Sequence, residues 1–401
     1  MPRRLAGLLA IGALVLAACS SGSGRSTPSA KPAAPLGDAF YKPPDPLPKG
    51  APGDVIWSAP VRAPQAGSKA WRVLYHSRAL DGHDIAVSGV VMAPDGPVPS
   101  GGRAIVTWAH GTSGIADACA PSKRGDKLVP GLDRFLAAGD MVVATDYEGL
   151  GTPGRHPYLV GESEGRGVLD IARAARHVDG LTPPGKRVLV YGHSQGGHAA
   201  LFAGQIASSY APDLDVIGVA AGAPVGDLKL LLEAASKIPS VFGYMVMGGA
   251  GFQAAYPEAR LDQVLTPQAL ADTKVVDSEC GDGVIRAFNR PLDQVLAHDP
   301  LTVPPWPTLL DQNTPGHVAT KAPLLVFQGD KDQLVVKPTT DAYVQRACAL
   351  GDSLDYRVYP GQDHGGVVAA SLADVVTWTS DREAGKPAKS SCGGAPAPPG
   401  A

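Results

Sequence analysis

The chain has 401 residues, of which 44% are hydrophobic and 18% are charged, a composition that supports a sizeable folded core and excludes a fully disordered protein. Its 35 basic and 38 acidic residues give a formal net charge of −3, which excludes a strongly basic nucleic-acid-binding protein. The 49 glycines and 38 prolines exceed the usual share, so part of the chain must form loops and tails.

The N-terminus has the pattern of an export signal. Two arginines precede an apolar stretch at residues 5–16 that is too short to span a bilayer. Ala17 and Ala18 stand directly before Cys19, and this arrangement resembles a bacterial lipobox, in which the cysteine becomes the acylated first residue of the mature protein. The alternative is an ordinary secretory signal with an incidental cysteine. We therefore expect an exported protein that is either a cell-envelope lipoprotein, anchored to the outer face of the cell membrane through lipidated Cys19, or secreted.

Composition divides the chain into four parts. Residues 1–18 are the expected signal peptide, residues 19–53 a flexible tether rich in Ser, Gly and Pro, residues 54–384 the folded domain, and residues 385–401 a C-terminal tail of similar composition. Export places the cysteines after Cys19 in an oxidising compartment, where they can pair. Four such cysteines allow three pairings, and the sequence alone does not choose among them.

Strand and helix patterns alternate along the folded part. Two β-rich runs, at residues 71–79 and 84–92, are joined by Asp81-Gly82 and predict a hairpin. Further strands are predicted at residues 103–109, 141–145, 186–191, 215–220, 322–327 and 354–359, and helices at residues 135–138 (the end of a short helix), 162–178, 198–209 and 367–378. This alternation predicts an α/β fold with a mostly parallel central sheet, helices on both faces and an antiparallel edge. Residues 223–321 contain no clear strand and predict a helical cap over the carboxyl edge of the sheet.

Residues 192–196, Gly-His-Ser-Gln-Gly, match the G-x-S-x-G pattern of a nucleophile turn between a strand and a helix. Such a turn exposes the serine hydroxyl and places it at a helix N-terminus, whose N–H groups can bind an oxyanion. A second match surrounds Ser163, but Glu162 and Glu164 flank it and would repel a developing negative charge. We interpret these carboxylates as favouring the positive end of the next helix, and Ser194 as the nucleophile.

A dinucleotide-binding pattern, G-x-G-x-x-G, occurs at residues 149–154. Pro153 and Pro157 prevent a helix from starting there, and a dinucleotide site needs that helix N-terminus under its pyrophosphate. We therefore interpret the segment as a tight loop and expect no cofactor.

A serine nucleophile needs a base and an acidic partner, which in this type of sheet follow it in the order acid, then histidine. Asp330 and Asp332 both follow the strand at 322–327, and His364 follows the last strand. The position alone leaves both aspartates open. The remaining histidines are predicted in turns beside the site (His110, His193), in the helix after the nucleophile (His198), or on the surface or cap (His156, His177, His298, His317). None gives the H-E-x-x-H spacing of a zinc site, and we expect no metal.

Five segments together resemble α/β-hydrolases of the secretory lipase family, the lipase A type. They are residues 103–114, the Asp-Tyr-Glu-Gly-Leu-Gly block at 146–151, and residues 192–197, 329–336 and 362–366, and the likeness extends from about residue 71 to residue 378. The resemblance implies a Ser194–His364–Asp332 triad, with Asp330 a structural loop residue.

The same resemblance implies the rest of the site. The oxyanion donors are the N–H groups of Gln195 and Thr112, and the Thr112 hydroxyl can add a further bond. The implied disulfides join Cys119 to Cys280 and Cys348 to Cys392. The lipobox and the tether depart from the plain secreted form of the family.

The implied activity is hydrolysis of acylglycerol esters by a triacylglycerol lipase or carboxylesterase, through an acyl-enzyme. An acyltransferase of the same fold shares that intermediate and stays open, as does a non-catalytic surface lipoprotein, although a complete Ser/His/Asp set argues against the latter. A peptidase is disfavoured by the family likeness alone. The apolar cap segment 241–252 has two interpretations, as the lining or lid of an acyl-chain channel or as the core of the cap.

Overall fold

The computed structural model describes residues 33–124 and 129–393, and its centre is a mixed nine-stranded sheet with strand order β1-β2-β3-β5-β4-β6-β7-β8-β9. The strands are β1 (Val55–Val61), β2 (Ser68–Arg78), β3 (Asp84–Pro94), β4 (Ile105–Ala109), β5 (Met141–Thr145), β6 (Arg187–His193), β7 (Asp215–Gly222), β8 (Leu324–Gly329) and β9 (Leu354–Tyr359). Strands β1, β2 and β3 are antiparallel, β3 pairs antiparallel with β5, and the strands from β5 to β9 are parallel. The predicted fold class is therefore confirmed, and β1 extends the predicted antiparallel edge.

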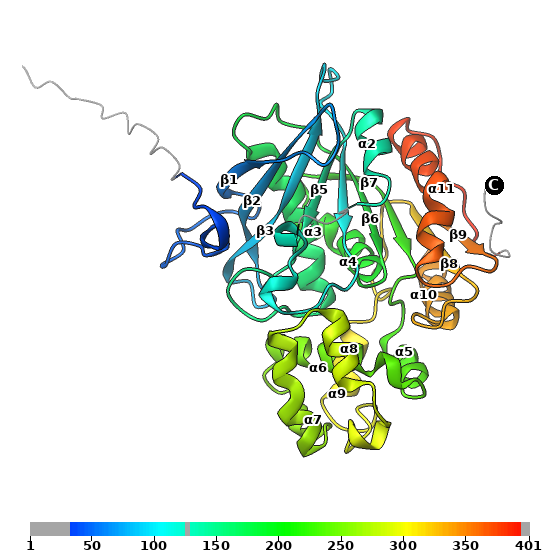
Figure 1. Cartoon of the computed structure of the whole chain (residues 1–401). Coiled ribbons are helices and arrows are strands. Elements are labelled where there is room, and N and C mark those ends of the chain that lie inside the picture. The colour runs from blue at the N-terminus through cyan, green and yellow to red at the C-terminus, as the bar shows by residue number, and fades with distance from the viewer. Residues whose placement is uncertain (1–32, 125–128, 394–401) are drawn as a thin grey trace, which may run out of the picture. The chain divides into compact units, whose positions relative to one another are not determined.

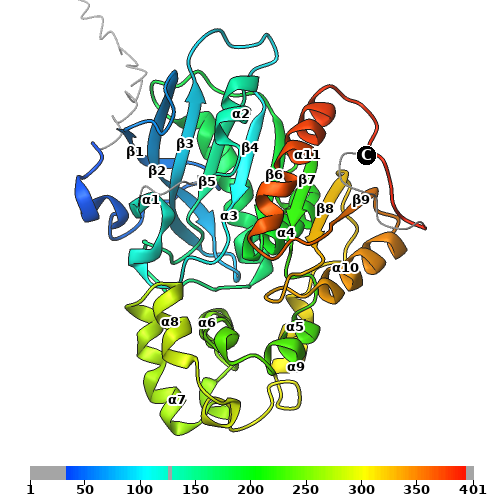
Figure 2. The same cartoon turned by 45° about the vertical axis from the view of Figure 1, so that its right-hand side comes forward.

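Two layers of helices cover the sheet (Figures 1 and 2). The helices of these layers are α2 (Leu132–Ala138), α3 (Gly161–Ala174), α4 (Gln195–Tyr210), α10 (Lys337–Ala349) and α11 (Gly366–Glu383), and the short α1 (Pro121–Arg124) lies beside β3. Helices α3, α4 and α10 share one core with one face of the sheet, while α2 and α11 share another core with the opposite face. In β5, Met141 and Val143 belong to the first core, and Val142 and Ala144 belong to the second. This alternation is the two-residue period of a strand that is buried on both faces.

The segment between β7 and β8 forms the cap, which is helical as predicted. Its helices are α5 (Leu228–Ala235), α6 (Phe242–Ala255), α7 (Pro267–Asp272), α8 (Gly281–Phe288) and α9 (Trp306–Gln312). The described chain also contains short 3-10 helices. Three precede the cap, η1 (Gly37–Tyr41), η2 (Asp117–Cys119) and η3 (Ala175–His177), and four lie within it, η4 (Pro239–Val241), η5 (Leu261–Gln263), η6 (Thr273–Asp277) and η7 (Leu292–Gln294). The cap has its own apolar core, and it lies at the edge of the sheet where the parallel strands end (Figures 1 and 2).

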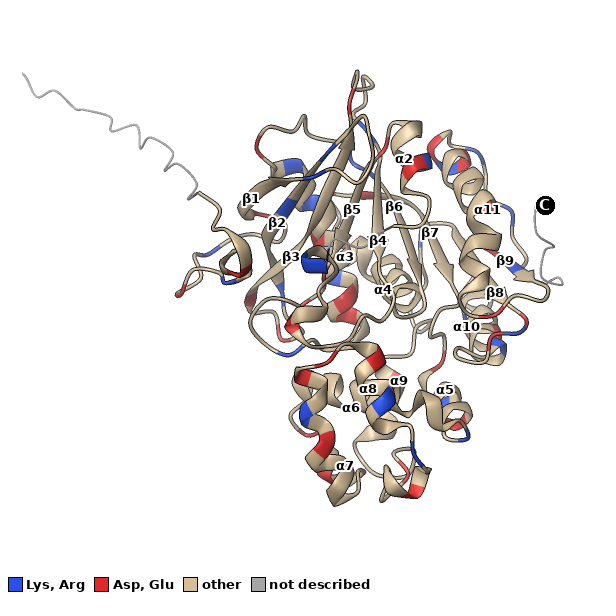
Figure 3. Ribbon diagram, in the orientation of Figure 1, with Lys and Arg blue, Asp and Glu red and all other residues tan. Residues whose placement is uncertain are grey.

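Charged residues lie mainly on the helices and loops around the sheet, and β4, β5 and β8 contain none (Figure 3). Burial on both faces explains this, because an unpaired charge inside the protein is strongly destabilising. Within the described part of the chain, no helix combines the length and the apolar character that a membrane crossing requires.

The prediction of a flexible tether over residues 19–53 is wrong for its last part. Gly37–Tyr41 form η1, in which Phe40 and Tyr41 are buried. The Trp57 indole donates a 2.9 Å hydrogen bond to the Phe40 carbonyl, and these aromatic residues form a small core with β1 and β2. The two aromatic residues at 40 and 41 supply the apolar surface that the rest of this Pro-rich segment lacks. Cys19 and the predicted signal peptide lie outside the described residues.

Candidate active site

Ser194 stands on the turn between β6 and α4, with a backbone φ of 62° and ψ of −121°. A positive φ is unusual for a residue with a side chain, and it is typical of a strained nucleophile turn. The glycines on either side are required by close packing. A Cβ at Gly192 would lie 2.0 Å from the Gly196 carbonyl oxygen, and a Cβ at Gly196 would lie 1.9 Å from the Ala109 carbonyl oxygen.

Asp332 and His364 meet at the ends of β8 and β9. The Nδ1 atom of His364 lies 2.7 Å from Oδ2 of Asp332. The Asp332 carboxylate is buried, and it also accepts hydrogen bonds from the Leu334 and Val335 N–H groups at 2.9 Å and from the Gln328 side chain at 3.0 Å. These donors fix the carboxylate, which in turn fixes the imidazole so that its second nitrogen, Nε2, is the one left for a reaction.

Asp330, the alternative acid, does not contact His364 in this arrangement. Its carboxylate is exposed and accepts a 2.6 Å hydrogen bond from the Gly361 N–H group. It therefore joins the loop after β8 to the loop after β9, which is the structural role that the family resemblance implies.

His193 connects the nucleophile turn to the His364 loop. Its Nε2–H group donates to the His364 carbonyl oxygen at 2.9 Å, and the two imidazole rings lie 4.6 Å apart. Burial, together with the smaller effect of the neighbouring His364, lowers the pKa of His193 to about 4. His193 is therefore neutral near pH 7.

Thr112 and Gln195 lie beside Ser194 on two different segments of the chain. Gln195 is the first residue of α4, directly after Ser194. Gly111 lies against the same turn, since a Cβ there would be 3.3 Å from the His193 carbonyl oxygen and 3.7 Å from the Ser194 Cβ, and Thr112 follows it in the chain. Thr112 and Ser194 line one pocket, and the Thr112 hydroxyl oxygen lies 2.7 Å from the hydroxyl of Tyr158.

A buried polar network lies behind Gln195, and the sequence analysis missed it. The Gln195 side-chain N–H₂ group donates to Oε1 of Glu164 at 2.8 Å and to Nε2 of His156 at 2.9 Å. Glu164 also accepts from the Leu159 N–H group at 3.0 Å and from Nδ1 of His198 at 3.1 Å. Glu164, His156 and His198 have no exposed surface.

Two interpretations from the sequence change as a result. His156, predicted at the surface or in the cap, is buried and donates from Nδ1 to the Glu148 carbonyl at 2.9 Å. Burial lowers the pKa of His156 to about 4, which keeps it neutral and able to accept the hydrogen bond from Gln195. Glu164 does lie in the first turn of α3, but as an internal acceptor for three partners rather than only as a charge at a helix end.

The other motifs that resembled functional sites have structural roles. Ser163 lies inside the first turn of α3 and donates a 2.5 Å hydrogen bond to Glu148. Gly149, Gly151 and Gly154 all have positive φ and form a tight loop, as predicted. His198 lies in α4 and His110 beside the site, as predicted, while His177, His298 and His317 are exposed. Among residues 33–124 and 129–393, no group of three or more His, Cys, Asp or Glu side chains is placed to hold a metal ion.

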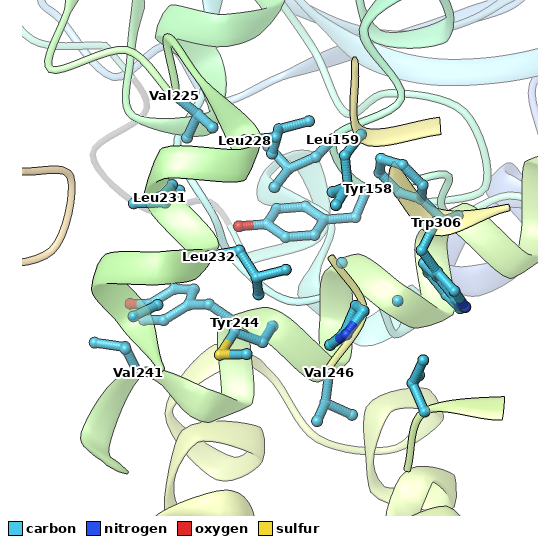
Figure 4. A pocket seen from close by; sticks show the side chains of 18 of the residues that line it. Tyr158, Leu159, Val225, Leu228, Leu231, Leu232, Val241, Tyr244, Val246 and Trp306 are labelled. Atoms are coloured by element: carbon cyan, nitrogen blue, oxygen red, sulfur yellow. The ribbon is translucent and has the colours of Figure 1, made fainter. Parts of the chain in front are cut away.

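The pocket in front of Ser194 is roofed by the cap and is almost entirely apolar. It has a volume of about 120 Å³, and the lining side chains that carry a polar atom are Thr112, Tyr158, Ser194, Tyr244 and Trp306. Segment 241–252 has two interpretations from the sequence, as the lining or lid of an acyl-chain channel and as the core of the cap, and helix α6 contributes side chains to both the pocket and the cap core. Met245 and Phe252 line the pocket, whereas Met247 and Ala250 are buried in the core of the cap. Figure 4 shows Tyr158 in the middle of the pocket, between leucines of α5 and the residues of α6.

The structure contains both disulfides that the resemblance implies. Cys119–Cys280 joins the segment after β4 to the start of α8 in the cap, and the Gly281 N–H group donates to the Ser113 carbonyl at 3.0 Å beside it. Cys348–Cys392 joins the end of α10 to the C-terminal segment. The first crosslink holds one side of the cap next to the strand end that carries Thr112.

Comparisons with known proteins point to one family. Residues 129–391 match the family described as secretory lipase. The chain is 27% identical over 393 residues to the secreted triacylglycerol lipase LIP4 of Malassezia globosa, which covers 89% of this chain and 83% of that protein. It is also 27% identical over 383 residues to a Mycobacterium tuberculosis protein named as a probable inactive lipase, covering 89% of this chain and 84% of that protein.

Solved structures give the same fold. Candida antarctica lipase A in its closed state aligns with a TM-score of 0.78 and 23% identity, over 91% of this chain and 90% of that chain. The rice cell wall degrading esterase LipA from Xanthomonas oryzae aligns with a TM-score of 0.70 and 20% identity, over 83% of this chain and 98% of that chain. The fold is therefore the α/β-hydrolase fold.

Proposed function

Because this chain belongs to the secretory lipase family, we propose that it is a serine hydrolase that cleaves carboxylic esters of acylglycerols, as a triacylglycerol lipase or carboxylesterase. The observation that carries the proposal is the 2.7 Å contact between Nδ1 of His364 and Oδ2 of Asp332. The loop of His364 is in turn joined to the Ser194 turn by the hydrogen bond from His193 to the His364 carbonyl. One relative is named as a probable inactive lipase, so family membership alone does not establish activity. Here a serine, a histidine and a buried aspartate are all present at the sheet edge.

The proposed reaction has two halves. Nε2 of His364 takes the proton of the Ser194 hydroxyl as its oxygen attacks the ester carbonyl, and the N–H groups of Thr112 and Gln195 stabilise the oxyanion. The C–O bond to the alcohol then breaks, His364 gives its proton to the departing alcohol, and an acyl-enzyme remains. Water attacks the acyl-enzyme with His364 again as base, which releases the fatty acid and restores the Ser194 hydroxyl.

The apolar pocket supports an acyl chain as the group bound in front of Ser194. Burying a chain costs no polar contact there, and each CH₂ group removed from water contributes about 0.8 kcal/mol. The same pocket offers few hydrogen-bond partners for a peptide backbone, which favours lipid esters over peptides.

The test is hydrolysis of p-nitrophenyl esters of graded chain length by the protein without residues 1–18 and with Cys19 replaced. We expect Ser194→Ala to lower kcat by a factor of about 10⁴ to 10⁶ while the protein stays folded. Turnover that survives in Ser194→Ala would contradict the proposed nucleophile. Adding a primary alcohol and measuring ester formation against hydrolysis distinguishes an acyltransferase, because both reactions pass through the acyl-enzyme.

We further propose that the protein is exported and lipidated at Cys19. Labelling of the cells with an alkyne fatty acid should mark the full-length protein and leave a Cys19→Ser variant unmarked. An unlabelled but exported wild type would indicate an ordinary secretory signal.

A further inference from the structure

We propose that Tyr158 is a positioning residue that orients the Thr112 hydroxyl as a third hydrogen-bond donor to the oxyanion formed at Ser194. This inference deepens the proposed function and rests on it. It begins from one contact, the 2.7 Å distance between the Tyr158 hydroxyl and Oγ1 of Thr112. Both side chains line the pocket in which Ser194 lies.

The direction of this hydrogen bond follows from the acidity of the two groups. A phenol is a better donor than an aliphatic hydroxyl, so Tyr158 donates and Thr112 accepts. Burial of the ring raises the pKa of Tyr158, which keeps its proton in place over the working pH range. Within the described residues neither hydroxyl has a second hydrogen-bond partner, so the Thr112 O–H group is left to donate elsewhere.

The pocket determines where that hydrogen can go. The surrounding side chains are mostly apolar, and a hydroxyl hydrogen without an acceptor is unfavourable there. Thr112 follows Gly111, whose backbone packs against the Ser194 turn. The oxyanion that develops on the carbonyl bound at Ser194 is an acceptor close to that position, and it exists only during the reaction. The hydrogen bond therefore favours the transition state over the bound ester.

The backbone around Tyr158 holds its ring in one place. Its N–H group donates to the His156 carbonyl at 2.8 Å, and the next residue, Leu159, has a φ of 61° and donates from its N–H to the buried Glu164. On the other side, helix α6 of the cap presses Gly251 against Tyr158, and a Cβ at Gly251 would lie 2.4 Å from the Tyr158 nitrogen. A residue that is held on both sides can orient a hydroxyl without losing further side-chain entropy.

The experiment is a double-mutant cycle of Tyr158→Phe and Thr112→Val, measured with a soluble short-chain p-nitrophenyl ester. We expect Tyr158→Phe to lower kcat about tenfold with KM within twofold, because a transition-state contact is lost. Thr112→Val should lower kcat about 100-fold, and Thr112→Ser, which keeps the hydroxyl, should retain most of it. In the Thr112→Val background, Tyr158→Phe should have no further effect on kcat.

Two controls make the outcomes decisive. Tyr210→Phe removes the 2.7 Å hydrogen bond from that phenol to Asp170, at the far end of α4, and should leave kcat unchanged. Titration of active sites with an organophosphonate corrects every kcat for the folded fraction. A Tyr158→Phe loss of equal size in the Thr112→Val background, or a wild-type kcat in Tyr158→Phe, would overturn the inference. Activity that survives in Ser194→Ala would instead overturn the proposed function, so the two failures are distinguishable.

Discussion

The two sides of the candidate site differ in kind. Behind the pocket, the sheet edge forms a polar, densely hydrogen-bonded wall, in which Asp332, Glu164 and Gln195 are each held by several partners without lining the pocket themselves. The wall formed by the cap is apolar, and Leu232, Val246 and similar side chains line the pocket there (Figure 4). The first wall has the directional bonds that fix reacting groups, and the second has the volume that accommodates a chain. We therefore expect mutations in the first wall to affect rate and stability, and mutations in the second to affect chain-length preference.

The largest expected effect on kcat comes from replacing Asp332, the proposed acid in the sheet-edge wall. Asp332→Asn should lower kcat by a factor of about 10⁴, because the amide no longer stabilises the imidazolium that forms on His364. Asp330→Asn is the matched control two residues away, and it should change kcat by less than threefold. Steady-state kinetics on one soluble ester measure both, and a larger loss in Asp330→Asn would assign the acid to the other residue.

The buried network of the same wall should dominate stability. Glu164→Ala leaves the Gln195 amide, the Leu159 N–H group and His198 without their shared acceptor, and should lower the free energy of unfolding by about 3–5 kcal/mol. Glu162→Ala, in the same helix turn but with a half-exposed side chain paired to Arg166, should cost less than about 1 kcal/mol. Urea titration gives both values, and equal losses would show that Glu164 acts only through the helix end.

The polar wall should also make the protein sensitive to acid. The pKa of His156 is lowered to about 4 in the folded protein, so below pH 6.5 the unfolded chain binds a proton that the folded chain does not. The contribution of neutral His156 to the free energy of unfolding is therefore fully present above pH 6.5. It is lost as the pH falls toward 4, and the loss amounts to up to about 3 kcal/mol.

Unfolding titrations between pH 7 and pH 4 measure this loss. His156→Gln should have a flatter pH dependence than the wild type. His298→Gln, a change at an exposed histidine of the cap, should leave the pH dependence as it is. Parallel curves for the wild type and His156→Gln would refute the assignment of this loss to His156.

The smallest expected effect concerns the apolar wall. Gly248 lines the pocket from α6, and a Cβ built there meets nothing within 4 Å. Gly248→Leu should fill the pocket and lower the ratio of long-chain to short-chain turnover about tenfold, while short-chain kcat changes less than twofold. Gly248→Ala should have a smaller effect. Because leucine also favours the helix over glycine by about 0.5–1 kcal/mol, lost stability cannot account for the shift. An unchanged ratio would show that the acyl chain does not occupy this part of the pocket.

Most strands were predictable because they are short apolar runs bounded by turn residues. The exceptions have a physical reason. β1 contains Pro60, and α10 has Pro338 and two consecutive threonines near its start, so neither segment has the local pattern of the element that it forms. Pairing with β2 and packing against β8 and β9 give these segments their structure, since tertiary contacts override weak local preference.

The sequence by itself determined the order of the elements, the nucleophile turn and the positions after β8 and β9 at which the acid and the base are proposed. These depend on local rules, because a glycine-flanked serine between a strand and a helix and the chain order of the triad are visible in one dimension. Only the tertiary structure paired His364 with Asp332 rather than with Asp330, buried His156, and brought Tyr158 to Thr112 across 46 residues. Such choices depend on which side chains face each other across the sheet edge, and no local pattern encodes that.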